Sequence, residues 1–190
     1  VVREQSKRPW LAYRPGIVVG SSETGQMDKI DGPYYFFKLI KRLRAVLPPW
    51  VPTVGVEGKQ INVVPVDFVA AAMDHIAHIE GLDNQAFHLT DPNPLTAGQL
   101  LNLFSRSATA PQMSIRIDPE MLNIIPPAIR GGLMMLTPVK RISDNVLADV
   151  GNPREVRVHV NYTTKFDCKN TLAALEGTDI SVPPLQTYAD

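Results

Sequence analysis

The feature that most constrains this chain is a short apolar run with a glycine at each end. Residues 17–19, Ile-Val-Val, predict a buried strand, and Gly16 and Gly20 mark its limits. A polar loop with hydroxyl side chains follows at residues 21–25. Ligands of doubly wound α/β proteins bind where strands end in this way. The run therefore predicts a sheet with a binding site at its carboxyl edge.

Composition indicates a soluble globular domain. A chain of 190 residues can bury a substantial core. Its 19 basic and 19 acidic residues give a formal net charge of zero, which argues against a nucleic-acid partner. No apolar run approaches the ~20 residues that span a bilayer. The single Cys168 excludes an internal disulfide and suits the reducing cytoplasm, which is the location that we expect.

Hydrophobic periodicity predicts strands that alternate with helices. The predicted strands cover residues 11–19, 60–64, 85–89 and 112–117, with a loop at residues 50–59. The predicted helices cover residues 33–47, 67–77, 96–107, 143–150 and 169–175, and one more begins at Asp118. Asp67 is predicted to cap its helix, and Thr96 and Gln99 have the spacing of a capping box. This order of elements is typical of an α/β fold.

Several stretches of the chain together resemble a known family. Residues 14–20 have the form Arg-Pro-x-x-Val-x-Gly, and residues 22–38 continue as SETGQMDKIDGPYYFFK. Two further stretches are INVVPVDFVA at residues 61–70 and AFHLTD at residues 86–91. Through these stretches the chain resembles the extended short-chain dehydrogenase/reductases, and more closely the bacterial fatty acyl-CoA reductases.

The resemblance implies an α/β fold with three parts. Residues 1–20 would hold the last strand or strands of a Rossmann-like cofactor domain, residues 21–180 a mixed, mainly helical substrate-binding cap, and residues 181–190 a linker or tail. It also implies a parent enzyme that uses NADPH to convert fatty acyl-CoA, through the aldehyde, to a fatty alcohol, as in wax ester biosynthesis. The chain begins at Val1 without a methionine, so we expect it to be a piece of such a parent.

The family's glycine-rich cofactor turn and its catalytic Tyr-x-x-x-Lys pair are expected outside this chain. The glycines from Gly16 to Gly25 lack the G-x-G-x-x-G spacing. Tyr34 and Lys38 match Tyr-x-x-x-Lys literally, but they follow the Arg-Pro strand, whereas the family's pair precedes it. We therefore expect the isolated chain to be inactive and not to bind NADPH by itself. The missing Rossmann half, and a second reductase domain after this segment, would be its partners.

Two groups of residues are predicted to form the site. By resemblance, Arg14, Pro15, Gly16, Ile17 and Val18 pass the nicotinamide as one wall of the cofactor site; a kinked, buried strand is a compatible alternative. The predicted substrate-binding residues are Ser21, Ser22, Thr24, Tyr34, Tyr35 and Lys38. For the hydroxyls of the loop, the alternative is that they bond the loop's own backbone.

Other polar clusters have less specific interpretations. The basic cluster of one predicted helix, formed by Lys38, Lys41, Arg42 and Arg44, could hold coenzyme A phosphates or be a solvated face. His75 and His78 are spaced to pair on a metal, but no third ligand is near and no metal is expected. His88 is expected to be a satisfied near-core side chain. The apolar residues 121–136 could form core, an acyl tunnel, a membrane-facing patch or a contact in a homo-oligomer.

Two alternative functions stay open. One is the substrate-binding part of another extended reductase, whose substrate is a carrier-bound thioester or another carbonyl compound. The other is a non-catalytic module that binds acyl-CoA. The first would be an enzyme fragment of the same fold, whereas the second would bind acyl-CoA regardless of NADPH.

Overall fold

The computed structural model describes residues 2–27, 34–117 and 164–189. The chain divides into two compact units. The first consists of Val1–Asp28, Asn62–Pro94 and Thr164–Tyr188, and the second of Lys29–Ile61, Leu95–Thr163 and Ala189–Asp190. Helices and pairs of parallel strands occur in both units, so the predicted α/β class is confirmed.

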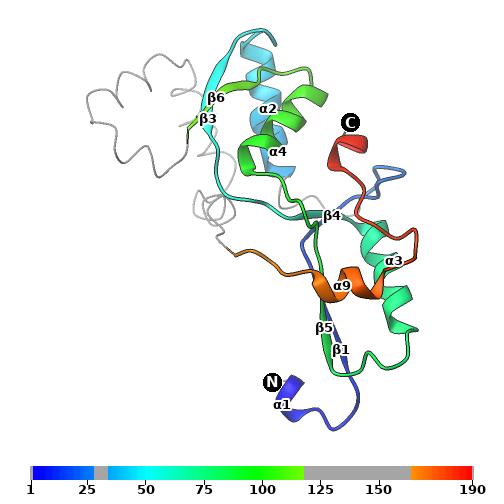
Figure 1. Cartoon of the computed structure of the whole chain (residues 1–190). Coiled ribbons are helices and arrows are strands. Elements are labelled where there is room, and N and C mark those ends of the chain that lie inside the picture. Colours follow the sequence, from blue (N-terminus) through cyan, green and yellow to red (C-terminus); the bar gives the residue numbers. More distant parts are fainter. Residues whose placement is uncertain (1, 28–33, 118–163, 190) are drawn as a thin grey trace, which may run out of the picture. The chain divides into compact units, whose positions relative to one another are not determined.

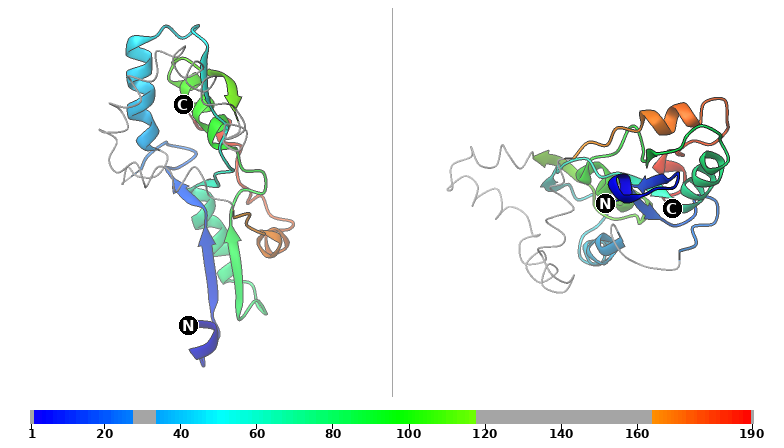
Figure 2. Two further views of the ribbon diagram at one scale, coloured as in Figure 1. Left: turned by 90° about the vertical axis from the view of Figure 1, so that its left-hand side faces the viewer. Right: turned by 90° about the horizontal axis from the view of Figure 1, so that it is seen from below.

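The first unit holds four strands in two parallel pairs. Strand β1 (Leu11–Pro15) pairs with β5 (Gln85–Leu89), and β2 (Ile17–Val19) pairs with β4 (Val63–Pro65). Figure 1 and the left view of Figure 2 show β1 and β5 side by side. The helices of this unit are α1 (Val2–Gln5), α3 (Val66–Ala77), α9 (Lys169–Ala174) and a 3-10 turn at Leu185–Thr187.

The predicted strand over residues 11–19 is two strands, because the chain changes partner at Gly16. The N–H of Gly16 donates to the carbonyl of Leu89 at 3.1 Å, whereas the N–H of Ile17 donates to the carbonyl of Asn62 at 2.8 Å. The Asn62 side chain spans the gap, since its amide donates to the carbonyl of Asp91 and accepts from the Asp91 N–H, both at 2.8 Å. A Cβ on residue 16 would lie 2.7 Å from Asn62 Oδ1, so glycine is required there.

The core of the first unit lies between its strands and helix α3. Apolar residues of α3 recur at helical spacing and face the buried residues of β4 and β5. Leu175, directly after α9, joins them. The buried cluster consists of Val64, Phe68, Val69, Ala72, Ile76, Phe87, Leu89 and Leu175. Strand β5 has the predicted bounds, and α9 and α3 fall within one residue of theirs at each end.

The second unit pairs β3 (Thr53–Val56) with β6 (Met113–Ile117) in parallel and contains helices α2 (Tyr35–Val46) and α4 (Ala97–Ser107). The two helices touch through Phe37 and Phe104, whose rings meet edge to face at 5.1 Å, and Ile40 is buried. The prediction of a loop over residues 50–59 was wrong. Strand β3 has a central glycine and a distant partner strand, so local periodicity carries no sign of it.

The capping box predicted at Thr96 is confirmed. The Thr96 hydroxyl accepts from the N–H of Gln99 at 3.2 Å, and the Gln99 side chain accepts from the N–H of Thr96 at 2.9 Å. These reciprocal bonds satisfy two backbone donors at the start of α4, which begins at Ala97 as the pattern predicts.

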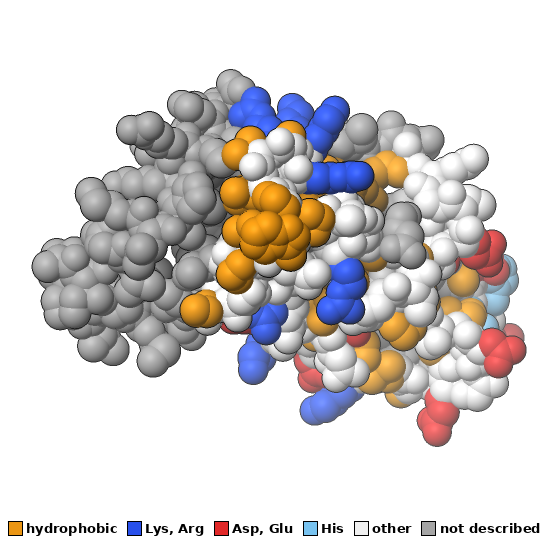
Figure 3. All heavy atoms as spheres, turned by 90° about the horizontal axis from the view of Figure 1, so that it is seen from above, with side chains coloured by type: hydrophobic (Ala, Val, Ile, Leu, Met, Phe, Trp, Pro, Cys, Tyr) orange, Lys and Arg blue, Asp and Glu red, His pale blue; other side chains and the backbone are white. Residues whose placement is uncertain are grey.

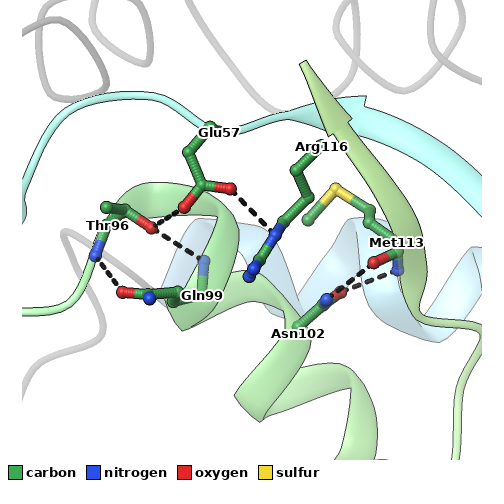
Figure 4. A network of polar contacts seen from close by, with 6 residues as sticks. All are labelled: Glu57, Thr96, Gln99, Asn102, Met113 and Arg116. Carbon is green, nitrogen blue, oxygen red and sulfur yellow. Dashed lines mark hydrogen bonds and ion pairs between the residues drawn. The ribbon is translucent and has the colours of Figure 1, made fainter. Parts of the chain in front are cut away.

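A polar network attaches α4 to both strands of its unit (Figure 4). Glu57, next after β3, accepts from the Thr96 hydroxyl and from Arg116 Nε of β6 at 2.8 Å. Further along α4, the Asn102 amide donates to the Met113 carbonyl at 2.9 Å and accepts from the Met113 N–H at 2.7 Å. Side-chain bonds therefore fix the helix to strands that are distant in the sequence.

Some predictions lie outside the described residues. They are Pro33 as the start of a helix, the helices after Asp118 and over residues 143–150, and the apolar residues 121–136. Among the helices of the described ranges, none has the length and apolar character needed to cross a bilayer.

The substitution Gly16→Ala should destabilise the protein by roughly 1–3 kcal/mol, because the new Cβ would overlap backbone and side-chain atoms of Asn62. Thermal unfolding followed by circular dichroism measures the loss. Ser114→Ala, at an exposed position of β6, is the control and should leave the midpoint almost unchanged. An equal midpoint for both variants would show that this close approach is not needed.

Replacement of the helix cap by Thr96→Ala should cost about 1 kcal/mol of stability, since the N–H of Gln99 loses its acceptor and Glu57 loses a donor. Ser107→Ala, at the exposed last residue of α4, is the matched control. Chemical denaturation of the two variants measures the difference. No difference between them would contradict a stabilising role for the capping box.

Candidate functional site

The loop after β2 is a closed turn at the carboxyl end of the strand. The N–H of Ser21 donates to the carbonyl of Gln26 at 3.0 Å, and the N–H of Gly25 donates to the carbonyl of Ser21 at 2.9 Å. Gly25 has a φ of +67°, a conformation that glycine adopts without strain. A Cβ at Gly20 would lie 2.9 Å from the Gln26 carbonyl, so the closed loop also requires that glycine.

A carboxylate fixes this loop to helix α3. The N–H of Ser22 donates to Asp67 Oδ1 at 2.7 Å, and the Ser22 hydroxyl donates to Asp67 Oδ2 at 2.5 Å. Asp67 lies in the first turn of α3, directly after β4. The two bonds therefore hold the segments after β2 and β4 together at the carboxyl ends of these paired strands, where ligands of α/β sheets bind. We call this pair of bonds the Ser22–Asp67 clamp.

The clamp also sets the ionisation of the aspartate. Partial burial by itself raises the pKa of Asp67, but the hydrogen bonds from the Ser22 hydroxyl and N–H, together with that from the backbone of Asp67 itself, outweigh it and hold the pKa below its ordinary 3.8. The position in the first turn of a helix also favours the anion. Asp67 is therefore a carboxylate at neutral pH and a strong acceptor for the loop.

The clamp corrects the role that the sequence suggested for Asp67. Helix α3 begins at Val66, its N-cap residue is Pro65, and no side chain caps it. The Asp67 carboxylate instead binds a loop 45 residues away in the sequence. Sequence reasoning missed this role, and it missed the bridging role of Asn62. The available signal was a polar residue at each end of an apolar strand, which does not reveal the distant partner.

The predicted substrate-side hydroxyls have two kinds of partner. Ser22 binds Asp67 of α3, whereas Ser21 and Thr24 form hydrogen bonds within the loop. Ser21 Oγ accepts from the N–H groups of Glu23 at 3.2 Å and Thr24 at 3.4 Å, and Thr24 Oγ1 accepts from the N–H of Gln26 at 3.3 Å. These bonds are the local turn bonds that formed the alternative interpretation. Because both hydroxyls act as acceptors here, each can still donate its proton to a ligand. A contact of Ser21, Ser22 or Thr24 with substrate stays a prediction.

The predicted cofactor wall lies on β1, β2 and the residue between them. The side chains of Arg14 and Pro15 are exposed, whereas Gly16, Ile17 and Val18 are half-buried. Val18 packs against the core of the unit. Arg14 and Pro15 can therefore meet a ligand with their side chains, while the next three residues offer mainly backbone. Contact with a nicotinamide stays a prediction.

The remaining predicted substrate residues belong to the second unit. Tyr34 immediately precedes α2, and its ring meets that of Phe37 edge to face at 5.2 Å. This contact packs the Tyr34 ring against the first turn of α2. Lys38 is exposed on α2, and Tyr35 is the first residue of that helix. Their role toward a substrate also stays a prediction.

Two histidines, His88 and His78, each lie within hydrogen-bond distance of a backbone carbonyl. His88 Nδ1 lies 2.9 Å from the Asp167 carbonyl, which can accept its proton, so this histidine has the partner that was expected. His78 Nδ1 lies 2.7 Å from the Asp74 carbonyl of its own helix. Within the described ranges, no group of three acidic, histidine or cysteine side chains is placed to hold a metal ion.

Within the described residues, the buried hydroxyls of Tyr13 on β1 and of Thr90 next to β5 have no hydrogen-bond partner. Burial also raises the pKa of Tyr13. Thr90 comes directly after β5, and only 4% of its surface is exposed. A buried hydroxyl without a partner costs about 1–3 kcal/mol. A ligand or another chain segment that forms a hydrogen bond with the Thr90 hydroxyl, at the carboxyl edge, would remove this cost.

Comparison with known proteins gives a consistent set of similarities. Residues 1–73 match the family model described as Male sterility protein. The chain is 33% identical over 84 residues to the non-canonical nonribosomal peptide synthetase hkm10 of Aspergillus hancockii, which covers 44% of this chain and 8% of that protein. It is 30% identical over 111 residues to the non-canonical nonribosomal peptide synthetase FrzA of Cladobotryum sp, which covers 56% of this chain and 10% of that one. The chain thus spans only a small part of these relatives.

Solved structures share the fold. The terminal R domain from the myxalamid PKS-NRPS biosynthetic pathway aligns with 99% of this chain and 44% of its own, at a TM-score of 0.59 and 23% identity. The structure of gox2253 aligns with 94% of this chain and 46% of its own, at a TM-score of 0.51 and 15% identity. The chain therefore shares the fold of part of this R domain and of part of gox2253.

The substitution Asp67→Asn should release the loop, because the amide has one acceptor oxygen where the carboxylate has two. Backbone amides of residues 21–26 should exchange with deuterium about tenfold faster or more. Mass spectrometry of peptides from this loop measures the rate. Asp74→Asn, at an exposed position of the same helix, is the control. Unchanged protection in the Asp67 variant would mean that the loop holds itself closed.

The pKa of Asp67 predicts how this protection depends on pH. Since the folded pKa lies below 3.8, the stabilisation by the clamp is complete above pH 3.8 and is lost as the pH falls through the lower, folded value. Loop amides should therefore stay protected from neutral pH down to about pH 4. Exchange rates corrected for their intrinsic pH dependence test this. A loss of protection near neutral pH would contradict the clamp.

Proposed function

We propose that this chain is the substrate-side part of a nicotinamide-dependent reductase domain that acts on a thioester bound to a carrier protein. The single observation that carries the proposal is the similarity of almost the whole chain to a terminal R domain. The matches to two nonribosomal peptide synthetases support it. The chain covers 44% of that R domain, so the proposal includes a further, cofactor-binding part of the domain.

The geometry of the first unit supports a substrate-binding role. The loop after β2 presents hydroxyls at the carboxyl edge of a parallel strand pair, and the Ser22–Asp67 clamp fixes its position. Ser21 and Thr24 can donate protons to a carbonyl oxygen or to the polar arm that carries the thioester. A fixed loop lowers the entropic cost of placing that carbonyl for reaction.

The residues of this chain fit only one wall of a cofactor site. The sequence has no G-x-G-x-x-G turn to bind a pyrophosphate. Exposed Arg14 and Pro15, with the backbone of β2, could line one side of a nicotinamide. When bound in the complete domain, NADPH would supply hydride to the carbonyl carbon. The catalytic tyrosine and lysine are proposed to lie in the cofactor-binding part.

Reduction of a fatty acyl-CoA, the first interpretation of the sequence, is the competing function. It is favoured by the resemblance of residues 22–38 to fatty acyl-CoA reductases. The two functions share the fold, the hydride donor and the thioester chemistry. They differ in the group that carries the acyl chain, which is coenzyme A in one case and a carrier protein in the other.

A direct comparison of substrates tests the proposal. The full-length protein that contains this chain is supplied with NADPH and one acyl group, bound either to a carrier protein or to coenzyme A. We expect kcat/KM to be at least about tenfold higher for the carrier-bound thioester, since only that substrate brings protein contacts. The decrease in nicotinamide absorbance gives the rate. A preference for the acyl-CoA would overturn the proposal in favour of fatty acyl-CoA reduction.

A further inference from the structure

We propose that helix α2 and the turn after it form a docking surface for an acidic protein, the carrier that brings the thioester. The partner's identity rests on the proposed function, whereas the surface itself rests on charge and exposure. It consists of Lys38, Lys41, Arg42, Arg44, Val46 and Trp50, and we call it the α2 surface. All six side chains are exposed. It lies entirely within the second unit.

Charge is strongly one-sided along this part of the chain. Between Tyr34 and Val56 the sequence has four basic residues and no acidic one. The whole chain has a formal net charge of zero, so the excess of positive charge here is local. A partner with a negative surface would be steered to this helix, because complementary charge raises association rates and fixes orientation.

Apolar side chains project from the same surface. Trp50 is 79% exposed and Val46 is 60% exposed. Figure 3 views the molecule from the side where α2 ends, and it shows hydrophobic side chains bordered by Lys and Arg side chains. Exposed tryptophan and arginine side chains are the residue types enriched at the energetic centre of protein interfaces.

The backbone holds the indole in place. The N–H of Val51 donates to the Pro48 carbonyl at 3.1 Å, which closes a turn with Pro49 and Trp50 at its two central positions. Proline at the first central position fixes φ and stiffens the turn. The exposed Trp50 is therefore presented by a rigid segment, which lowers the entropy lost when a partner covers it.

The opposite side of α2 argues for a protein rather than a bilayer. A helix that lies in a membrane surface inserts a broad apolar face. In α2 much of that face is covered within the unit: Ile40 is 3% exposed, and the ring of Phe37, although 42% exposed, packs against Phe104 of α4. Among the described side chains of α2 and the turn after it, the exposed large hydrophobic ones are Phe37, Val46 and Trp50, enough for an anchor in a partner's cleft but too little for insertion of the helix.

The test compares substitutions on this surface with matched controls. One variant combines Lys41→Glu and Arg44→Glu, and a second carries Trp50→Ala. Lys7→Glu with Arg8→Glu is the charge control, and Leu172→Ala is the apolar control, all at exposed positions of the first unit. Circular dichroism and thermal unfolding establish that each full-length variant is folded.

Two measurements are made on each protein. Isothermal titration with the carrier protein, bearing its pantetheine arm but no acyl group, gives binding without any reaction. Initial rates with the carrier-bound thioester and with the same acyl group on free pantetheine give KM and kcat. We expect both α2-surface variants to weaken carrier binding and raise KM for the carrier-bound thioester by about tenfold or more. Kinetics with the pantetheine thioester and both controls should not change.

Each outcome decides one point. Unchanged carrier binding and KM in the α2-surface variants would overturn the docking surface while the proposed function stands. Carrier binding that depends on Trp50, in a protein that reduces no thioester, would support the surface and overturn the proposed function. The protein could instead bind vesicles of equal parts phosphatidylcholine and phosphatidylserine and not bind the carrier protein. That result would mean that the α2 surface contacts a lipid bilayer, and it would overturn the proposal of an acidic protein partner.

Discussion

The rest of the first unit depends on the exchange of partners at Gly16. One continuous segment pairs with β5 up to Pro15 and with β4 from Ile17 onward, and Asn62 fills the gap between the two partner strands. Glycine permits the close approach, and the Asn62 amide satisfies polar backbone groups that would otherwise be lost between the strands. Without this exchange, β2 and β4 would not end side by side.

The paired ends of β2 and β4 then create the candidate site. The segment after β4 becomes helix α3 at once, which brings Asp67 to the loop after β2. The helix N-terminus favours the anion, and the anion accepts two bonds from Ser22. The loop of the candidate site thus takes its position from the core helix as well as from its own turn bonds. Packing and site geometry are connected through one carboxylate.

Local patterns predicted the elements whose signals are local. The capping box of Thr96 and Gln99 and the alternation in residues 112–117 each give the correct element. Strand β3 and the roles of Asn62 and Asp67 were missed, because each depends on a partner far away in the sequence: β6, Asp91 and Ser22 respectively. The hydroxyl loop was predicted from the strand that precedes it, but the bond that fixes this loop comes from outside it.

Charge separation links the fold to the proposed partner. Because the chain is neutral overall, the four positive charges of α2 are balanced by net negative charge on its other segments. An acidic protein is therefore attracted to α2 and repelled by the net negative charge of the other segments, so its orientation is selected as well as its affinity. Coenzyme A phosphates would also be attracted to the positive charge of α2, whereas a protein is large enough to cover the charged helix together with the exposed Val46 and Trp50.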